Sequence, residues 1–176
     1  MIQKKICMVG AFGVGKTSLV SRFVHSIFSE KYQTTVGVKI DKKQLTIDGE
    51  EVTLVLWDLA GEDALTTVKP AHLRGASGYL LVIDGTRKST LDVAISLQQR
   101  AREAVGDAPF IVVINKADVQ ESWEIKDADL GSLTALGWDV VRASAKNGEA
   151  VEYIFLEIAK QMLRKDHAEQ HSTAGA

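Results

Sequence analysis

A glycine-rich stretch near the N-terminus has the residue types and the spacing of a phosphate-binding loop. Its sequence, Gly10-Ala-Phe-Gly-Val-Gly15-Lys16-Thr17, matches the pattern G-x-x-x-x-G-K-[ST] without a mismatch. Glycines let the backbone curl so that successive N–H groups point at phosphate oxygens, and the N-terminus of a following helix adds partial positive charge. Lys16 supplies a full charge for β- and γ-phosphates, and Thr17 offers a hydroxyl to Mg²⁺. The stretch therefore predicts a site for a nucleoside polyphosphate and its magnesium ion.

A second short motif, Trp57-Asp58-Leu-Ala-Gly61, closes a predicted strand. An aspartate at the carboxyl end of a strand beside the phosphate loop suits a water-mediated contact with Mg²⁺. Gly61 allows a backbone N–H group to approach a γ-phosphate. Taken alone, D-x-x-G is equally compatible with a plain turn at the end of a strand. Its position after a phosphate loop favours the functional interpretation.

A third motif, Asn115-Lys116-Ala-Asp118, follows another apolar strand. The carboxylate of Asp118 can accept two hydrogen bonds, from the N1–H and the N2 amino group of guanine. Adenine lacks this pair of donors, and a site built to bond a group can reject the analogue without it by around 10⁴-fold. Asn115 and Lys116 would tie this loop to the phosphate loop and cover the base. The motif therefore predicts selection of guanine.

The segment Ser144-Ala145-Lys146 ends the last predicted strand. Its backbone N–H groups can meet the guanine carbonyl, and the stem of Lys146 can cover the face of the base. By itself the segment is a weak signal, since a capped turn before the final helix has the same sequence character. It gains meaning only from its place after the three motifs above.

The loop after the first predicted helix, Tyr32-Gln-Thr-Thr35-Val-Gly37, contains a candidate ligand-sensing residue. Thr35 can offer its hydroxyl to Mg²⁺ and its N–H to a γ-phosphate. That contact exists only with a triphosphate, so the loop is a candidate switch. Phe28, at the start of the loop, can pack edge-on against the base, although a lone phenylalanine after a helix is more often part of the core.

The remaining pattern alternates strands with helices, which predicts an α/β fold with a mostly parallel sheet. Strands are expected at 2–9, 37–47, 51–59, 78–84, 110–115 and 138–143, and helices at 16–27, 90–105 and 148–164. Asp48-Gly49 separates the second and third strands and predicts an antiparallel hairpin. The apolar residues of the second strand change parity between Ile40 and Leu45, which predicts a bulge or bend there. The segment 123–137 is ambiguous, because two glycines interrupt it.

The composition excludes several classes of protein. The chain has 176 residues, 45% of them hydrophobic and 25% charged, as expected of one folded domain rather than a disordered chain. With 21 basic and 23 acidic residues the formal charge is −2, which argues against a nucleic-acid binder that works by bulk electrostatics. The single cysteine, Cys7, rules out an intramolecular disulfide and points to a reducing compartment.

The chain also lacks the sequence signals of a membrane protein. No apolar run approaches the roughly 20 residues that span a bilayer. Ile2 is not the glycine that myristoylation needs, and the C-terminal residues include no prenylatable cysteine. We therefore expect a cytoplasmic protein without a lipid anchor or a transmembrane segment. From Asp166 onward the chain is polar and small, so the expected domain is 1–165, with a flexible tail at 166–176.

The four motifs, in this order and spacing, resemble those of the small GTPase family, closest to its Ras and Rab-like branch. The resemblance covers about residues 2–165. It implies a P-loop NTPase G domain, with a six-stranded, mostly parallel sheet in the order 2-3-1-4-5-6, an antiparallel strand 2 and helices on both faces. It also implies a switch that binds GTP or GDP with Mg²⁺ and hydrolyses GTP to GDP. Effectors and exchange or activating proteins would read two mobile loops, at about 28–38 and 60–75.

Carried onto this sequence, the resemblance implies a set of site residues. Metal contacts would come from Thr17, Thr35 and Asp58, and catalytic roles from Lys16, Thr35, Gly61 and Glu62. Nucleotide contacts would come from Gly10, Phe12, Gly13, Val14, Gly15, Lys16, Thr17, Ser18, Phe28, Thr35, Asp58, Gly61, Asn115, Lys116, Asp118, Ser144, Ala145 and Lys146.

Two positions depart from the common pattern of the family. Glu62 occupies the place of a glutamine that orients the attacking water in many relatives. Two unit charges about 5 Å apart at an effective dielectric of 20 repel by about 3 kcal/mol, so Glu62 must point away, be protonated or act as a base. Phe12 stands where a small residue is usual, and its ring can crowd the γ-phosphate and an arginine supplied in trans, which is worth about 10³–10⁵ in rate. Both departures predict slow intrinsic hydrolysis.

Two other functions remain open from the sequence. The same departures, Phe12 and Glu62, also suit an adaptor that binds GTP without hydrolysing it. An ATP-using kinase would share the first motif, but it predicts no Asn115-to-Asp118 motif and needs a lid for which the sequence has no segment.

Overall fold

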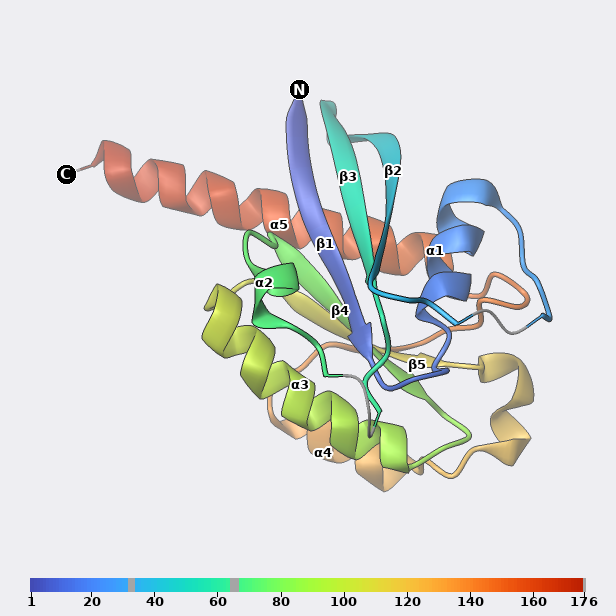
Figure 1. Cartoon of the computed structure of the whole chain (residues 1–176). Coiled ribbons are helices and arrows are strands. Elements are labelled where there is room, and N and C mark those ends of the chain that lie inside the picture. The colour runs from blue at the N-terminus through green and yellow to red at the C-terminus, as the bar shows by residue number, and fades with distance from the viewer. Residues whose placement is uncertain (32–33, 64–66, 176) are drawn as a thin grey trace.

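The predicted alternation of strands and helices is confirmed by a single six-stranded sheet in the order β2-β3-β1-β4-β5-β6 (Figure 1). The computed structural model describes residues 1–31, 34–63 and 67–175. β2 pairs antiparallel with β3, and the other neighbouring strands are parallel. The strands are β1 Ile2–Gly10, β2 Val38–Ile47, β3 Glu50–Leu59, β4 Gly78–Asp84, β5 Phe110–Asn115 and β6 Val140–Arg142.

Helices cover both faces of the sheet (Figure 1). They are α1 Lys16–His25, α2 Pro70–Leu73, α3 Ser89–Val105, α4 Asp127–Ala135 and α5 Val151–Ala174, with a 3₁₀ turn, η1, at Ala117–Ser122. α1 and α5 pack on one face of the sheet, while α2, α3 and α4 pack on the other. Among the described helices, none has the length and apolar character that a membrane crossing requires.

The central strands bury both faces, as their apolar sequences predict. In β4, Leu80 and Val82 face the layer of α1 and α5, while Tyr79, Leu81 and Ile83 face the layer of α3. Successive side chains of a strand point to opposite faces, so a strand between two helical layers needs apolar residues at every position. This double burial holds these strands, whose carboxyl ends carry polar motifs, in the middle of the sheet.

The segment 123–137 resolves into a short helix, α4. The helix starts where the side chain of Asp129 accepts a hydrogen bond from the backbone N–H of Lys126, at 2.9 Å. This contact satisfies one of the free N–H groups at the helix start. Gly131 lies within α4, where an added Cβ atom would meet nothing within 4 Å, so packing does not require glycine at this position. Gly137, with φ of 79°, lies beyond the helix end.

Of the bulge or bend expected in the second strand, the bulge is absent, so that part of the prediction is wrong. Pairing between β2 and β3 is continuous from Val38–Leu59 to Ile47–Glu50. The apolar residues change parity because the two ends of β2 meet different layers. Leu45 and Ile47 pack under α1 and α5, whereas Val38 packs against the opposite layer.

The segment 166–176, expected to be a flexible tail, is helical up to Ala174, where α5 ends; Ala176 lies outside the described residues. Adding residues to an existing helix costs much less than starting one, so a polar sequence extends it readily. Two side-chain contacts join the start of this extension to the sheet. Lys4 binds Asp166, and the His167 imidazole lies 3.3 Å from the Glu50 carboxylate.

A pair of stacked aromatic rings joins α1 to α5. The ring centroids of Phe23 and Phe155 lie 4.1 Å apart, with an interplanar angle of 8°, and both side chains are buried.

We expect Phe155→Ala to lower the free energy of unfolding by about 3–5 kcal/mol, because it removes a large buried ring and leaves a cavity. Urea denaturation of the GDP-bound protein measures this loss. Tyr153→Ala, on the exposed side of the same helix, should change stability by less than about 0.5 kcal/mol, and equal losses in both variants would contradict the assignment.

Candidate functional site

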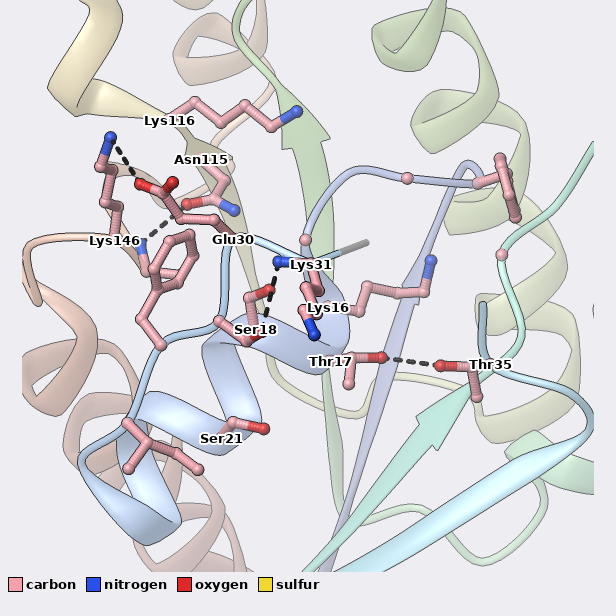
Figure 2. Close-up of a pocket in the computed structure, with 18 of the residues that line it drawn as sticks. Lys16, Thr17, Ser18, Ser21, Glu30, Lys31, Thr35, Asn115, Lys116 and Lys146 are labelled. Atoms are coloured by element: carbon pink, nitrogen blue, oxygen red, sulfur yellow. Dashed lines mark hydrogen bonds and ion pairs between the residues drawn. The ribbon is translucent and has the colours of Figure 1, made fainter. Parts of the chain in front are cut away.

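A cavity of about 350 Å³ opens at the edge of the sheet where the parallel strands have their carboxyl ends (Figure 2). Five separate segments line it: the phosphate loop and the start of α1, residues 27–31 with Thr35, the end of β3 with Leu59 and Gly61, the turn after β5, and the turn after β6. The residues of these segments are far apart in sequence and are brought together by the strand order. The lining includes residues from all four motifs.

The phosphate loop curls around the ammonium group of Lys16. In this structure its Nζ atom donates to the carbonyl oxygens of Gly10, at 3.1 Å, and Ala11, at 2.9 Å. Burial lowers the pKa of Lys16 to about 8, with Asp58 opposing the shift and Arg87 adding to it. Among the described residues the hydrogen-bond partners of this ammonium group are carbonyl oxygens, so an anion that enters the loop would stabilise its charged form.

Two threonines and an aspartate form a compact oxygen cluster beside Lys16. The Thr17 hydroxyl donates to Asp58 Oδ2 at 2.6 Å and lies 2.7 Å from the Thr35 hydroxyl. Burial raises the pKa of Asp58, against the hydrogen bond from Thr17 and the charge of Lys16. The other carboxylate oxygen, Asp58 Oδ1, is buried without a hydrogen-bond partner among the described residues. Hard oxygen donors with an unsatisfied carboxylate fit Mg²⁺, which Thr17 and Thr35 could bind directly and Asp58 through water.

The side chain of Asn115 connects three loops at the other end of the cavity. Its Nδ2 donates to the Val14 carbonyl at 3.0 Å, and its Oδ1 accepts from the Ala145 N–H at 3.2 Å. Asp118 Oδ1 accepts from the Ser144 hydroxyl at 2.7 Å, which orients the carboxylate and leaves its second oxygen for a ligand. This end of the cavity thus presents a fixed acceptor to whatever base enters.

Glu62 is turned away from the cavity. Its carboxylate binds the guanidinium of Arg100 on α3 and accepts from the Val68 N–H at 3.3 Å. The cavity lining formed by the described residues includes Gly61 but not Glu62. Of the three alternatives that the sequence left open for Glu62, this geometry corresponds to pointing away.

The backbone at Glu62 is also tied to the phosphate loop. The Phe12 N–H donates to the Glu62 carbonyl at 3.0 Å, and the Glu62 N–H donates to the Gly10 carbonyl at 3.1 Å. A Cβ atom at Gly61 would lie 2.5 Å from the Phe12 Cα, so only glycine allows this close approach. The start of the second expected switch loop, 60–75, therefore rests directly on the phosphate loop.

Comparison with known proteins assigns the family. The model of the Ras family matches residues 5–164. The Ras-related protein SEC4 of Saccharomyces cerevisiae is 36% identical over 164 residues, which covers 92% of this chain and 75% of SEC4. The Ras-related protein RABE1e of Arabidopsis thaliana is 34% identical over 167 residues, with 92% and 75% covered, and human Rab-12 is 33% identical over 164 residues, with 92% and 67% covered.

The chain belongs to the Ras family. It is a small GTPase, a switch that binds GTP or GDP with Mg²⁺ and acts through protein effectors and regulators. The alternative of a non-hydrolysing adaptor is not favoured. The predicted fold class, the G domain with strand order 2-3-1-4-5-6 and an antiparallel strand 2, is confirmed.

The Ras-family cavity brings together most of the residues that the motifs predicted. Those that line it are Phe12, Gly13, Gly15, Lys16, Thr17, Ser18, Phe28, Thr35, Gly61, Asn115, Lys116, Asp118, Ala145 and Lys146. Four others lie behind the lining, and each supports it: Gly10 and Val14 offer carbonyl oxygens, while Asp58 and Ser144 bind lining residues through their side chains. Tyr32 and Gln33 of the first switch loop, and 64–66 of the second, lie outside the described residues.

Several residues near the Ras-family site were not predicted from the sequence. Ser21, Ile27, Ser29, Glu30, Lys31 and Leu59 also line the cavity. The buried carboxylate of Asp84, at the end of β4, binds Lys116 Nζ at 2.7 Å. Burial alone would raise the pKa of Asp84, but hydrogen bonds from Lys116, Thr86 and Arg87 outweigh it and lower the pKa. Its place at the end of an apolar strand, like those of Asp58 and Asn115, was the signal available in the sequence.

The lowered pKa of Lys16 predicts a pH dependence of nucleotide binding. Phosphates favour the charged amine, so the pKa of Lys16 rises on binding and the complex takes up a proton above a pH of about 8. Affinity for GDP should be constant below that pH and fall by up to about 10-fold per pH unit above it. Calorimetry in two buffers of different ionisation enthalpy measures both the affinity and the proton uptake. Lys16→Arg stays charged, so it should bind GDP more weakly but with an affinity that does not change with pH. A wild-type affinity that did not change with pH would contradict the lowered pKa of Lys16.

Selection of the base is tested by Asp118→Asn. The amide presents a donor where the carboxylate presents only acceptors, so it no longer matches the amino group of guanine but matches the oxygen at C2 of xanthine. We expect GDP affinity to fall by about 100-fold or more and affinity for xanthosine diphosphate to rise. Competition binding measures both. Asp139→Asn, an exposed carboxylate outside the site, is the control, and unchanged xanthosine diphosphate binding in the Asp118 variant would sink the assignment.

Proposed function

We propose that this Ras-family GTPase hydrolyses GTP slowly when unassisted, because its Glu62 carboxylate is held outside the nucleotide site by Arg100. In this assignment Thr17, Thr35 and Asp58 hold the magnesium ion. Lys16 and the N–H groups of the phosphate loop bind the phosphates, and Asp118 selects guanine. What supports these roles is that the residues converge on one cavity with donors, acceptors and charges suited to each part of the ligand.

The single observation that carries the proposal is the ion pair of Glu62 with Arg100. Both carboxylate oxygens accept from Arg100 Nη2, and the two side chains are only 20% and 30% exposed. Pairing with a cation removes the repulsion that an unpaired carboxylate would exert on a γ-phosphate. The same pairing leaves the position after Gly61 without a side chain that orients the attacking water. The ion pair therefore permits GTP binding while leaving hydrolysis slow.

Phe12 adds, in this proposal, a restraint on hydrolysis assisted by another protein. The residue is part of the cavity lining, on the loop that surrounds Lys16, and its side chain is exposed. A ring at this place occupies the space through which an arginine from another protein would approach the γ-phosphate. The output of the switch would pass through the loops at about 28–38 and 60–75 to a protein effector, with Thr35 sensing the third phosphate.

Replacement of Glu62 tests the proposal. We expect wild-type hydrolysis on the order of 10⁻⁴ per second or slower, the scale of unassisted turnover in such switches. Glu62→Gln should raise this rate by about 10-fold, because the amide can leave Arg100 and orient a water molecule. Single-turnover conversion of Mg²⁺·GTP to GDP, followed by chromatography, gives both rates.

Two matched variants separate the causes in that experiment. Arg100→Gln frees the carboxylate without supplying an amide at position 62, so its rate should stay at or below that of the wild type. Glu103→Gln, at an exposed position of the same helix, should leave the rate unchanged. Equal rates for the wild type and Glu62→Gln would remove Glu62 as the cause of slow turnover.

A further inference from the structure

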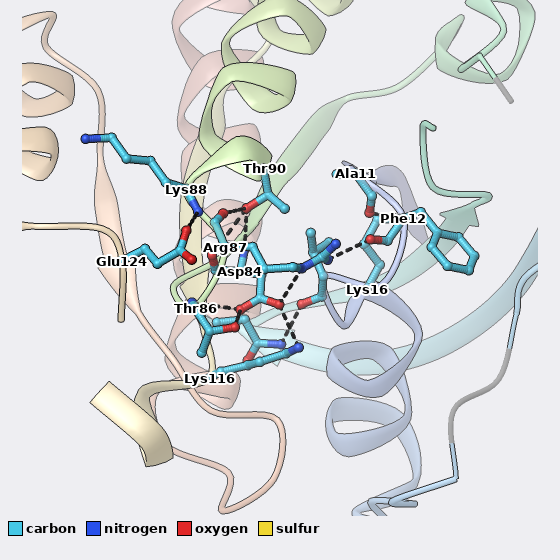
Figure 3. A network of polar contacts seen from close by, with 12 residues as sticks. Ala11, Phe12, Lys16, Asp84, Thr86, Arg87, Lys88, Thr90, Lys116 and Glu124 are labelled. Atoms are coloured by element: carbon cyan, nitrogen blue, oxygen red, sulfur yellow. Dashed lines mark hydrogen bonds and ion pairs between the residues drawn. The ribbon is translucent and has the colours of Figure 1, made fainter. Parts of the chain in front are cut away.

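The loop that follows β4 lies against the outer side of the phosphate loop (Figure 3). Arg87 of this loop makes two contacts through its guanidinium group. Its Nη2 donates to the carbonyl oxygen of Phe12 at 2.7 Å, and its Nε donates to Asp84 Oδ2 at 3.0 Å. The planar guanidinium group thus joins a backbone carbonyl of the phosphate loop to a buried carboxylate.

The contact with Phe12 fixes the orientation of one peptide group. A trans peptide is planar, and its C=O and N–H bonds point in opposite directions. Since the Phe12 carbonyl points toward Arg87, the N–H of Gly13 points to the other side of the loop, where Gly13 lines the cavity. This N–H is therefore turned toward the space that the phosphates would occupy.

Steric restraints alone would not hold this peptide group. Gly13 has φ of 74°, and glycine accepts positive and negative φ at similar cost, so the peptide between Phe12 and Gly13 can rotate. Rotation would aim the negative end of a carbonyl dipole at the phosphates in place of a donor. The hydrogen bond from Arg87 opposes that rotation.

Arg87 is itself held firmly in place. The Asp84 carboxylate is fully buried and also accepts from Thr86, through its N–H at 2.9 Å and its hydroxyl at 2.7 Å. The Arg87 carbonyl accepts from the N–H of Thr90 at 3.1 Å and from its hydroxyl at 2.7 Å. Asp84 Oδ2 binds Lys116 as well as Arg87, so one carboxylate joins the phosphate loop to the loop of the base site.

We propose that Arg87 is a positioning residue of the phosphate loop: it holds the Phe12 carbonyl outward so that the Gly13 N–H faces the nucleotide phosphates. Arg87 acts through the peptide group and is absent from the cavity lining formed by the described residues. The inference rests on the proposed function for the identity of the ligand. It also predicts that the contribution of Arg87 is confined to the phosphate end of the ligand.

The test compares GDP with GMP in wild-type protein and in Arg87→Ala. Both ligands carry the same base and ribose, and they differ in the phosphate that reaches further into the loop. We expect Arg87→Ala to weaken GDP binding by roughly 10-fold, the scale of one charge-assisted hydrogen bond, and GMP binding by less than about 2-fold. The rate of GDP release should rise to match. The readout is the ratio of the two affinities, which a general loss of stability would not change.

Arg102→Ala is the matched control. It removes the same charge from an exposed position on α3, where Arg102 lies 3.6 Å from Asp107, and it should leave the ratio unchanged. Arg87→Lys keeps the charge, but a single ammonium group lacks the two-pronged geometry, so it should give an intermediate ratio. This variant also decides the question if Arg87→Ala does not fold.

The outcomes separate this inference from the proposed function. Wild-type protein that bound neither GDP nor GMP would overturn both. Wild-type protein that bound both nucleotides, with the same affinity ratio in Arg87→Ala and Arg87→Lys, would overturn the role of Arg87 alone. An equal fall of the ratio in Arg102→Ala would assign the effect to net charge and would also overturn it.

Discussion

The amide of Asn115 is the interaction on which the geometry of the site depends. One side chain donates to Val14 in the phosphate loop and accepts from Ala145 in the turn after β6, while its own backbone ends β5. An amide group offers both a donor and an acceptor in one plane, which a carboxylate or an ammonium group cannot do. A buried residue of the base end therefore ties that end directly to the phosphate loop.

Most charged groups around the cavity have hydrogen-bond or ion-pair partners within the protein. Each buried carboxylate near the site has assigned donors on at least one oxygen, and Asp84 has four. Glu62 is neutralised by Arg100, so it adds no unpaired anion next to the phosphate loop. Among the described residues, in contrast, Lys16 has only carbonyl partners for its hydrogen bonds and Asp58 Oδ1 has no partner. The incomplete groups are those that would meet phosphate and magnesium.

The sequence was informative where a single short segment contains the whole signal. The phosphate loop, Asp118 and the apolar strands could be predicted because local spacing or composition defines them. The network of Asp84 and Arg87 was not predicted, since its partners Phe12 and Lys116 lie 75 and 32 residues away along the chain. The orientation of the Glu62 side chain depends on Arg100, 38 residues away along the chain. Three alternatives for Glu62 were therefore left open by the sequence alone. The helical end of α5 could not be predicted, because its polar composition gives no sign of the contacts that Asp166 makes with Lys4 and His167 with Glu50.

The continuous pairing of β2 with β3 restricts how the hairpin can move. A slip of one residue would reverse the facing of every side chain in β2, which would withdraw Ile47 from one layer and Val38 from the other at the same time. A register that kept the facing of the side chains would require a shift of two residues, about 7 Å along the strand. The pairing of Val38 with Leu59 therefore gives the loop that enters the hairpin a fixed starting point.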